Sequence, residues 1–210
     1  MAEPARLREP IARSPVAAAP PVAVVDGWEV SQRRSDAGLR LADRTPLAKV
    51  LVRSEPSSPS AAPLGVGFGG AARRPDGVLV VGSGPGEWLL IGPPNTAPDL
   101  AAGVPGGNGT GPVSVVDVTH GRAMVRLSGP DAARALAKLC AIDLRERVTP
   151  DGAAFRSMVA NVSTDVVRDD RDGVPSYLLH CERSSGQYLF DALLDACAEF
   201  GGDVDGFDAR

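Results

Sequence analysis

Residues 113–144 read VSVVDVTHGRAMVRLSGPDAARALAKLCAIDL and give the least ambiguous local structure in the chain. An apolar run is followed by a polar turn, then by an alternating segment at 122–128, and finally by a helical pattern. In the alternating segment, Ala123, Val125 and Leu127 recur at every second position, which is the period of a β-strand. The stretch therefore predicts a strand, turn, strand and helix unit, and it carries no chemistry of its own.

The other face of the alternating segment is a candidate interface. Because side chains alternate along a strand, we expect Arg122, Met124 and Arg126 to face solvent or a neighbouring subunit. Trp28 follows an Ala/Pro-rich leader, and a large aromatic at such a boundary marks a point where the chain docks on its own domain or on another subunit. These four residues are predicted to contribute to a subunit contact.

Composition excludes several classes of protein. The chain has 210 residues, 43% of them hydrophobic, with 24 glycines and 19 prolines, which fits one domain with loosely packed extensions. A net charge of -4 gives no electrostatic footprint for nucleic acid or an anionic membrane. Three scattered cysteines form no C-x-x-C pair and suit a reducing compartment. Without a spanning run or a signal-peptide pattern, we expect a cytoplasmic protein.

The chain divides into three regions by its Pro, Gly and apolar content. Residues 1–27 form an Ala/Pro-rich leader without helical or strand period, which we expect to be flexible. Residues 28–201 are expected to form a single domain, with a loop excursion at 92–112 that holds at most about one helical turn. Residues 202–210 read as a frayed tail.

The periodicity of the domain predicts an α+β fold, with helices on one face of a mainly antiparallel sheet. Gly201 is a stop signal for the last helix, and Asp172 with Gly173 suits a tight hairpin turn. Beyond the opening stretch, the expected strands cover 47–52, 78–81, 88–91, 155–162, 165–169 and 176–182, and the expected helix covers 185–200.

Two patterns resemble functional motifs without their context. The run GSGPGE at 82–87 follows a strand, as in a dinucleotide-binding turn, but Glu87 stands at the third glycine position and the apolar run WLLI follows instead of a helix. It reads as a hairpin turn. The acidic residues within 165–172 read as a solvated hairpin, because runs of charge usually lie at the surface.

The two histidines offer little chemistry at the level of sequence. His120 lies in a turn with no nucleophile or carboxylate at a diagnostic spacing, so a structural role is favoured. His180 and Cys181 are adjacent in a strand and should point to opposite faces, so they make a poor zinc pair. No catalytic, cofactor-binding or metal-ligating residue is assigned.

The run VVDVTHGRAMVRLSGPDAARALAKLCAIDL, with GEWLLIGPP upstream and QYLFDALLDACAEFG downstream, closely resembles the gamma subunit of heterotetrameric sarcosine oxidases. That subunit is similar to the folate-binding domain of glycine-cleavage aminomethyltransferases. The resemblance covers about 41–201 and leaves out the leader and the tail.

The resemblance implies a non-catalytic structural subunit without a cofactor of its own. Such a subunit docks directly on the large alpha subunit, in a complex with beta and delta subunits. The alpha and beta subunits carry NAD, FAD, FMN and tetrahydrofolate, and delta carries zinc. The complex oxidises sarcosine to glycine with release of hydrogen peroxide, and it passes the one-carbon unit to tetrahydrofolate.

Two alternatives follow from the same resemblance. In the aminomethyltransferases a hairpin leads to a catalytic Asp beside the pterin, and the aligned region MVANVSTDVVRDD makes Asp165 its counterpart, although the family's glycine-rich turn is missing. The chain would then be a stand-alone folate-dependent one-carbon transferase. Its sequence lacks the K-G-C-Y-x-G-Q-E signature of the related iron–sulfur repair proteins. Alternatively, it is the equivalent subunit of a complex that acts on another N-methyl amino acid, such as N-methylglutamate.

Overall fold

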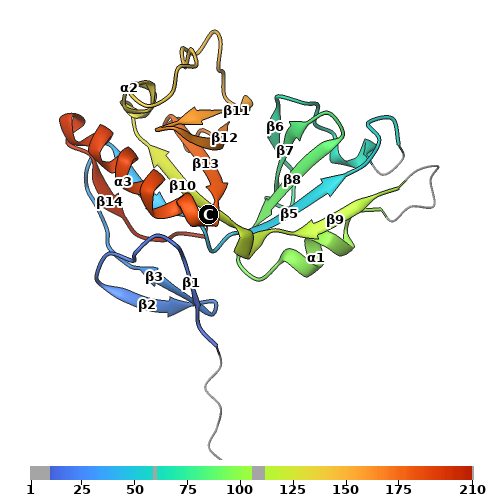
Figure 1. Ribbon diagram of the computed structural model, residues 1–210, viewed down its shortest axis with the longest axis horizontal. Helices are drawn as coiled ribbons and strands as arrows, with labels where there is room; N and C mark the ends of the chain where they lie inside the picture. Colours follow the sequence, from blue (N-terminus) through green and yellow to red (C-terminus); the bar gives the residue numbers. More distant parts are fainter. Residues whose placement is uncertain (1–9, 59–60, 106–111, 210) are drawn as a thin grey trace, which may run out of the picture.

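The computed structural model describes residues 10–58, 61–105 and 112–209, and their strands form three sheets (Figure 1). Pairing is antiparallel except between β1 and β3 and between β14 and β4, among the strands so described. The prediction of a mainly antiparallel α+β fold is confirmed, with the strands divided among three sheets instead of one.

The largest sheet has six strands in the order β11-β12-β13-β10-β4-β14. We call it sheet B. Helices α2 and α3 cover one of its faces (Figure 1). In α3, Gly186 permits this close packing, because a Cβ there would lie 2.5 Å from the Cβ of Ala123. The elements are β4 (Arg40–Asp43), β10 (Arg122–Ser128), α2 (Ala132–Ala137), β11 (Ala154–Val159), β12 (Val162–Arg168), β13 (Ser176–Glu182), α3 (Gly186–Cys197) and β14 (Asp203–Asp205).

The second sheet, sheet C, has five strands in the order β6-β7-β8-β5-β9. Its outer face packs against α1, where Leu100 joins a cluster with Val50, Val80 and Leu90. Its inner face packs against sheet B, so the protein has four layers in the order helices, sheet B, sheet C and helix (Figure 1). The elements are β5 (Ala48–Arg53), β6 (Ala71–Arg73), β7 (Leu79–Gly84), β8 (Glu87–Gly92), α1 (Ala97–Ala102) and β9 (Ser114–Asp117).

Both faces of β10 are buried, which corrects the predicted interface. Ala123, Val125 and Leu127 pack under the helices, as expected. Met124 is fully buried between the two sheets, beside Leu178 of β13. Arg126 is 5% exposed on the same side. The prediction that Met124 and Arg126 face solvent or another subunit is wrong, because sheet C covers this face of the strand.

The leader contributes a small third sheet, sheet A, in the order β1-β3-β2. Its strands are β1 (Ala12–Arg13), β2 (Val22–Val25) and β3 (Trp28–Ser31). The expectation of a flexible leader is therefore corrected over residues 10–27, which contain short paired strands; the prolines between these strands leave no readable period. Residues 1–9 lie outside the described part of the chain.

The tail is ordered by pairing, which corrects the expectation that it frays. Strand β14 pairs in parallel with β4 at the edge of sheet B. Beyond it, the N–H of Phe207 donates to the carbonyl of Ser31, and the ring of Phe207 is 9% exposed in the cluster between the sheets. Two backbone hydrogen bonds, from Gly206 and Phe207, tie the tail to the end of β3.

Most local predictions hold, with shifts at their boundaries. The 82–87 run turns the β7–β8 hairpin, Asp172 and Gly173 adopt positive φ in the turn before β13, and α1 forms in the excursion. Residues 106–111 of that excursion lie outside the described ranges. The predicted strand 155–162 is wrong at its end, because Ala160 and Asn161 take positive φ and reverse the chain there. No helix in the described residues is long and apolar enough to cross a membrane.

Candidate functional site

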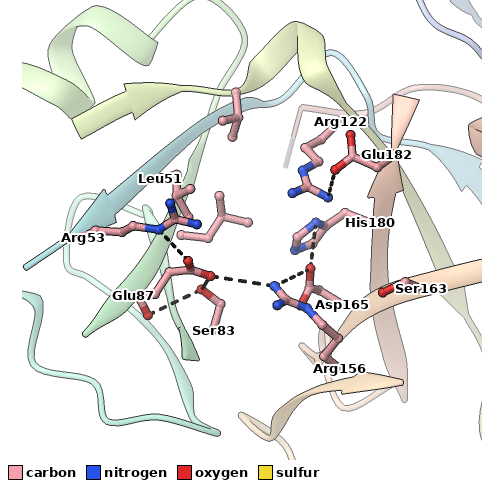
Figure 2. Close-up of a pocket in the computed structure, with 12 residues that line it drawn as sticks. Leu51, Arg53, Ser83, Glu87, Arg122, Arg156, Ser163, Asp165, His180 and Glu182 are labelled. Carbon is pink, nitrogen blue, oxygen red and sulfur yellow. Dashed lines mark hydrogen bonds and ion pairs between the residues drawn. The ribbon is translucent and has the colours of Figure 1, made fainter. Parts of the chain in front are cut away.

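A cavity of about 230 Å³ opens between sheets B and C, and charged residues from both sheets line it (Figure 2). The apolar part of the lining includes Leu51, Leu89 and Val118. The charged and titratable part comprises three arginines, three carboxylates and one histidine: Arg53, Arg122, Arg156, Glu87, Asp165, Glu182 and His180.

Strand register brings these side chains together. Asp165 of β12 lies directly opposite both Arg156 of β11 and His180 of β13. Arg122 of β10 lies opposite Glu182 in the same sheet. In sheet C, strands β5 and β8 likewise place Arg53 opposite Glu87. Because directly opposed side chains on one face of a sheet are close neighbours, each pairing follows from the antiparallel register.

Arg156 holds the carboxylate of Asp165 by two hydrogen bonds, from Nε at 2.6 Å and from Nη2 at 3.2 Å. The same guanidinium lies 3.7 Å from a carboxylate oxygen of Glu87, across the gap between the sheets. Glu87 in turn accepts a 2.8 Å hydrogen bond from Nε of Arg53. Figure 2 shows this row of alternating charges running from one sheet to the other.

His180 is the polar side chain in this row without a hydrogen bond. It is 4% exposed, and its Nδ1 lies 3.6 Å from Oδ2 of Asp165. Neither ring nitrogen has a hydrogen-bond partner within the described part of the chain. Burial lowers the pKa of His180 to about 4, and the nearby Asp165 opposes that shift only in part. The imidazole is therefore neutral at pH 7.

The pairing limits what the cavity can do chemically. Each carboxylate in the lining is paired with an arginine: Asp165 with Arg156, Glu87 with Arg53, and Glu182 with Arg122 at 2.8 Å. A general base needs a carboxylate oxygen that can reach the substrate proton. Because Arg156 takes both oxygens of Asp165, the arrangement suits a structural ionic network better than acid–base chemistry.

The predicted interface residues do not meet on one surface. Trp28 is 2% exposed and its ring stacks on that of His120, with centroids 4.8 Å apart and planes at 9°. Trp28 therefore docks on its own domain, and His120 lies in the turn before β10, where its ring packs on Trp28. Arg122 lies at the rim of the cavity with its side chain 30% exposed, so its contact with a subunit stays a prediction. Met124 and Arg126 lie between the sheets.

Sequence reasoning missed the burial of the acidic segment. Asp165 and Asp169 are each 7% exposed, whereas a solvated hairpin was expected. The alternation of Asp165 and Val167 in β12 with Asp169 just after it was the available signal, because Val167 belongs to the cluster between the sheets. His180 and Cys181 point to opposite sides, as predicted. No group of three or more potential metal ligands occurs in the residues that the structure describes.

Two sequence relatives and two solved structures show what the chain is similar to, and no family model matches it. It is 31% identical over 160 residues to the sarcosine oxidase subunit gamma of an Arthrobacter species, covering 72% of this chain and 76% of the relative. It is also 31% identical to the subunit of the same name from Corynebacterium sp. strain P-1, over 60% of this chain and 59% of that protein's length. A chain of the heterotetrameric sarcosine oxidase from Corynebacterium sp. U-96 superposes with a TM-score of 0.67 and 27% identity, covering 82% of this chain and 90% of that chain.

The fold extends to a second class of protein. The glycine cleavage system aminomethyltransferase T from Bartonella henselae superposes with a TM-score of 0.65, covering 88% of this chain and 55% of that chain. At 15% identity this likeness concerns the fold alone. The expected relation to the aminomethyltransferase fold is confirmed.

Proposed function

Because the chain belongs to the family of sarcosine oxidase gamma subunits, we propose that it is a non-catalytic subunit of a heterotetrameric oxidase that demethylates sarcosine. The observation that carries the non-catalytic part is the pairing of every carboxylate in the cavity lining with an arginine. The complex would produce glycine and hydrogen peroxide and pass the one-carbon unit to tetrahydrofolate.

In this proposal, FAD, FMN, NAD, tetrahydrofolate and zinc belong to the partner subunits. The chain itself docks directly on the large alpha subunit, with beta and delta completing the assembly. The substrate pocket lies in a partner, so another N-methyl amino acid would be compatible with the same subunit. The three cysteines are buried thiols, which suits a reducing compartment, and we expect the complex in the cytoplasm.

The leader sheet is the contact surface that we favour. Strand β2 is an edge strand of sheet A, and its Val22 and Val24 are 46% and 54% exposed on one side. An edge strand with exposed apolar side chains readily pairs or packs with another chain. Ile11, at 53% exposed, adds apolar surface to the same leader.

Co-expression with the alpha, beta and delta subunits tests the proposal. We expect a stoichiometric complex, and the purified chain alone should show no flavin absorbance. The double substitution Val22→Ser with Val24→Ser should reduce co-purification. The matched control is Val116→Ser with Val148→Ser, which removes valines that are 47% and 50% exposed elsewhere.

Two outcomes would count against this proposal. A chain that never co-purifies with the oxidase subunits would overturn the assignment as a subunit. Unchanged assembly of the Val22/Val24 variant would remove the leader sheet from the contact. Charge reversal at Arg126 is unsuitable as an interface test, because Arg126 is buried against Asp169 and its loss would disturb the fold itself.

A second candidate, a stand-alone folate-dependent transferase, is favoured by one observation. Asp165 and the neutral His180 both line the cavity between the sheets. Arg156 already donates to both oxygens of the carboxylate that would meet the pterin, so a pterin donor would share them. Calorimetric titration of the chain with tetrahydrofolate should give no heat of binding. Saturable binding that disappears in Asp165→Asn would favour the transferase instead.

A further inference from the structure

We propose that a second pocket of this chain binds a small organic anion with a carboxylate or phosphate head and an apolar body. The pocket has a volume of about 390 Å³ and lies where the turn after β6, the end of β8 and the connection from β12 to β13 meet. Its described lining shares no residue with the cavity around His180. The side chains that matter are Arg73, Arg126 and Arg171, with Leu47, Ile91 and Leu178.

Three guanidinium groups converge on one carboxylate at the edge of this pocket. Oδ2 of Asp169 lies 2.7 Å from Nη2 of Arg126, 2.8 Å from Nη2 of Arg73 and 3.0 Å from Nε of Arg171. A single carboxylate neutralises only one of these three positive charges. The pocket therefore keeps an excess of positive charge at a partly buried position.

Neighbouring acidic residues offset only part of this excess. Asp76, also in the lining, is paired with Arg74 on the same turn. The charge of Asp208 acts on Arg126, but it acts on Arg44 as well. Counting Asp208 in full, three arginines face two carboxylates around this pocket, and the exposed Asp172, which lines the adjoining pocket with Arg73 and Arg171, offsets the remaining positive charge from the solvent side. A bound monoanion would meet that charge from the pocket side.

The arginines also have hydrogen-bond donors to spare. Arg126 has a side chain that is 6% exposed, and its Nε has no hydrogen-bond partner in the described residues. This nitrogen has almost no accessible surface, so a ligand would meet the other donors of the cluster. In the same part of the chain, the one side-chain hydrogen bond of Arg171 runs from Nε to Asp169, which leaves its terminal nitrogens for a ligand. A planar guanidinium matches the two oxygens of a carboxylate or phosphate.

The wall opposite the arginines is apolar. Leu47, Ile91 and Leu178 come from the start of β5, from β8 and from β13, and all belong to the cluster that joins the two sheets. Such a wall gains hydrophobic free energy from an apolar ligand body and nothing from a bare ion. The ligand class is therefore an organic anion, with its head at Arg171 and its body along the leucines.

Binding of acetate, benzoate and phenyl phosphate to the complete chain at fixed ionic strength, followed by calorimetry, tests this proposal. Acetate presents the head alone, and the other two add an apolar ring. We expect saturable binding of benzoate or phenyl phosphate, at least about tenfold tighter than that of acetate. Arg171→Gln should weaken it by about tenfold or more, the usual effect of losing a charge-assisted hydrogen bond.

Two further variants make the result decisive. Arg171→Lys keeps the charge but loses the planar fork, and its affinity should lie between those of the parent and Arg171→Gln. Arg134→Gln removes an equal charge from a remote pair with Asp131 and should leave binding unchanged. Thermal unfolding of each variant checks that the fold survives. Equal binding of all three probes, an equal loss in Arg171→Gln and Arg134→Gln, or no saturable binding would overturn the proposal.

Discussion

Two aspartates, one in β12 and one just after it, illustrate how neighbours decide what a buried charge does. Asp165 and Asp169 lie four residues apart, both face sheet C, and both are 7% exposed. Arg156 alone donates hydrogen bonds to Asp165, with a neutral histidine beside it. Three arginines share Asp169. The first site has one arginine for its carboxylate and the second has three, although residue type and exposure are the same.

The difference arises from what each aspartate meets on the opposing elements. Asp165 meets the row of paired charges that the register of β5 with β8 and of β10 with β13 creates. Asp169 meets Arg73 at the end of β6, Arg126 in the middle of β10 and Arg171 in the following turn. Equal burial therefore predicts neither the strength of an ionic site nor its capacity for a ligand. The number of guanidinium groups around each carboxylate predicts both properties.

The substitution Asp169→Asn should have the largest effect on stability. It leaves three arginines around a neutral amide, one of them almost fully buried. Removing one partner of a buried charge pair costs about 3 to 5 kcal/mol. We expect a loss of this size in the free energy of unfolding, measured with denaturant. Asp172→Asn is the control, because Asp172 is exposed in the turn and adopts a positive φ that Asn tolerates. Equal losses in the two variants would contradict the comparison.

The next largest effect concerns pH and belongs to the Asp165 site. The pKa of His180 is lowered to about 4 in the folded chain, against about 6.5 when unfolded. Below about pH 6.5 the unfolded chain binds a proton that the folded chain does not, so stability falls as the pH drops from 6.5 to 4. Linkage gives a loss of about 3 kcal/mol over this window.

His180→Gln should remove that loss and leave the titration of the carboxylates in place. Unfolding free energies of parent and variant, measured between pH 4 and pH 7, would show whether the curve of the variant is flatter in this range. If both proteins lose stability in parallel, His180 does not titrate with the shift that its burial predicts.

The smallest effect is expected for Asp165→Asn at neutral pH. Arg156 has a side chain that is 52% exposed, so it can turn to Glu87 and to water when the carboxylate is lost. Exposed pairs and single hydrogen bonds contribute about 1 kcal/mol each. Denaturant unfolding of Asp165→Asn and Asp169→Asn under the same conditions compares their losses of unfolding free energy directly. Similar losses for the two aspartates would show that the count of arginines does not control these sites.

The sequence predicted those parts of the fold that depend on local periodicity. The alternation in β10, the turn at Asp172 and Gly173 and the stop of α3 near Gly201 all have a local cause, and the structure has each of them. Which helix or sheet covers a given face of a strand depends on distant parts of the chain, so it has no local cause. The local sequence around Arg126 is the same whether its side chain contacts water or Asp169, so its burial could not be predicted.

The leader and the candidate sites were hidden for related reasons. Strands β1 and β2 have two and four residues and are separated by prolines, which is too short for any period to be read. The partners that donate hydrogen bonds to Asp165 and Asp169 come from three different strands and a turn. Arg156 and Arg126 belong to sheet B and Arg73 to sheet C, and periodicity within one strand contains no information about which strands become neighbours.

The pairing of β14 with β4 affects how the chain can fold as it is synthesised. Residues 203–205 complete an edge of the sheet begun by residues 40–43, and Phe207 closes on Ser31. These contacts span most of the chain, so they form late and slowly. On the ribosome, Trp28 and its neighbours must wait for residues 203–207 before their cover is complete. Until then they are an exposed apolar surface that a co-translationally present partner or chaperone would protect from aggregation.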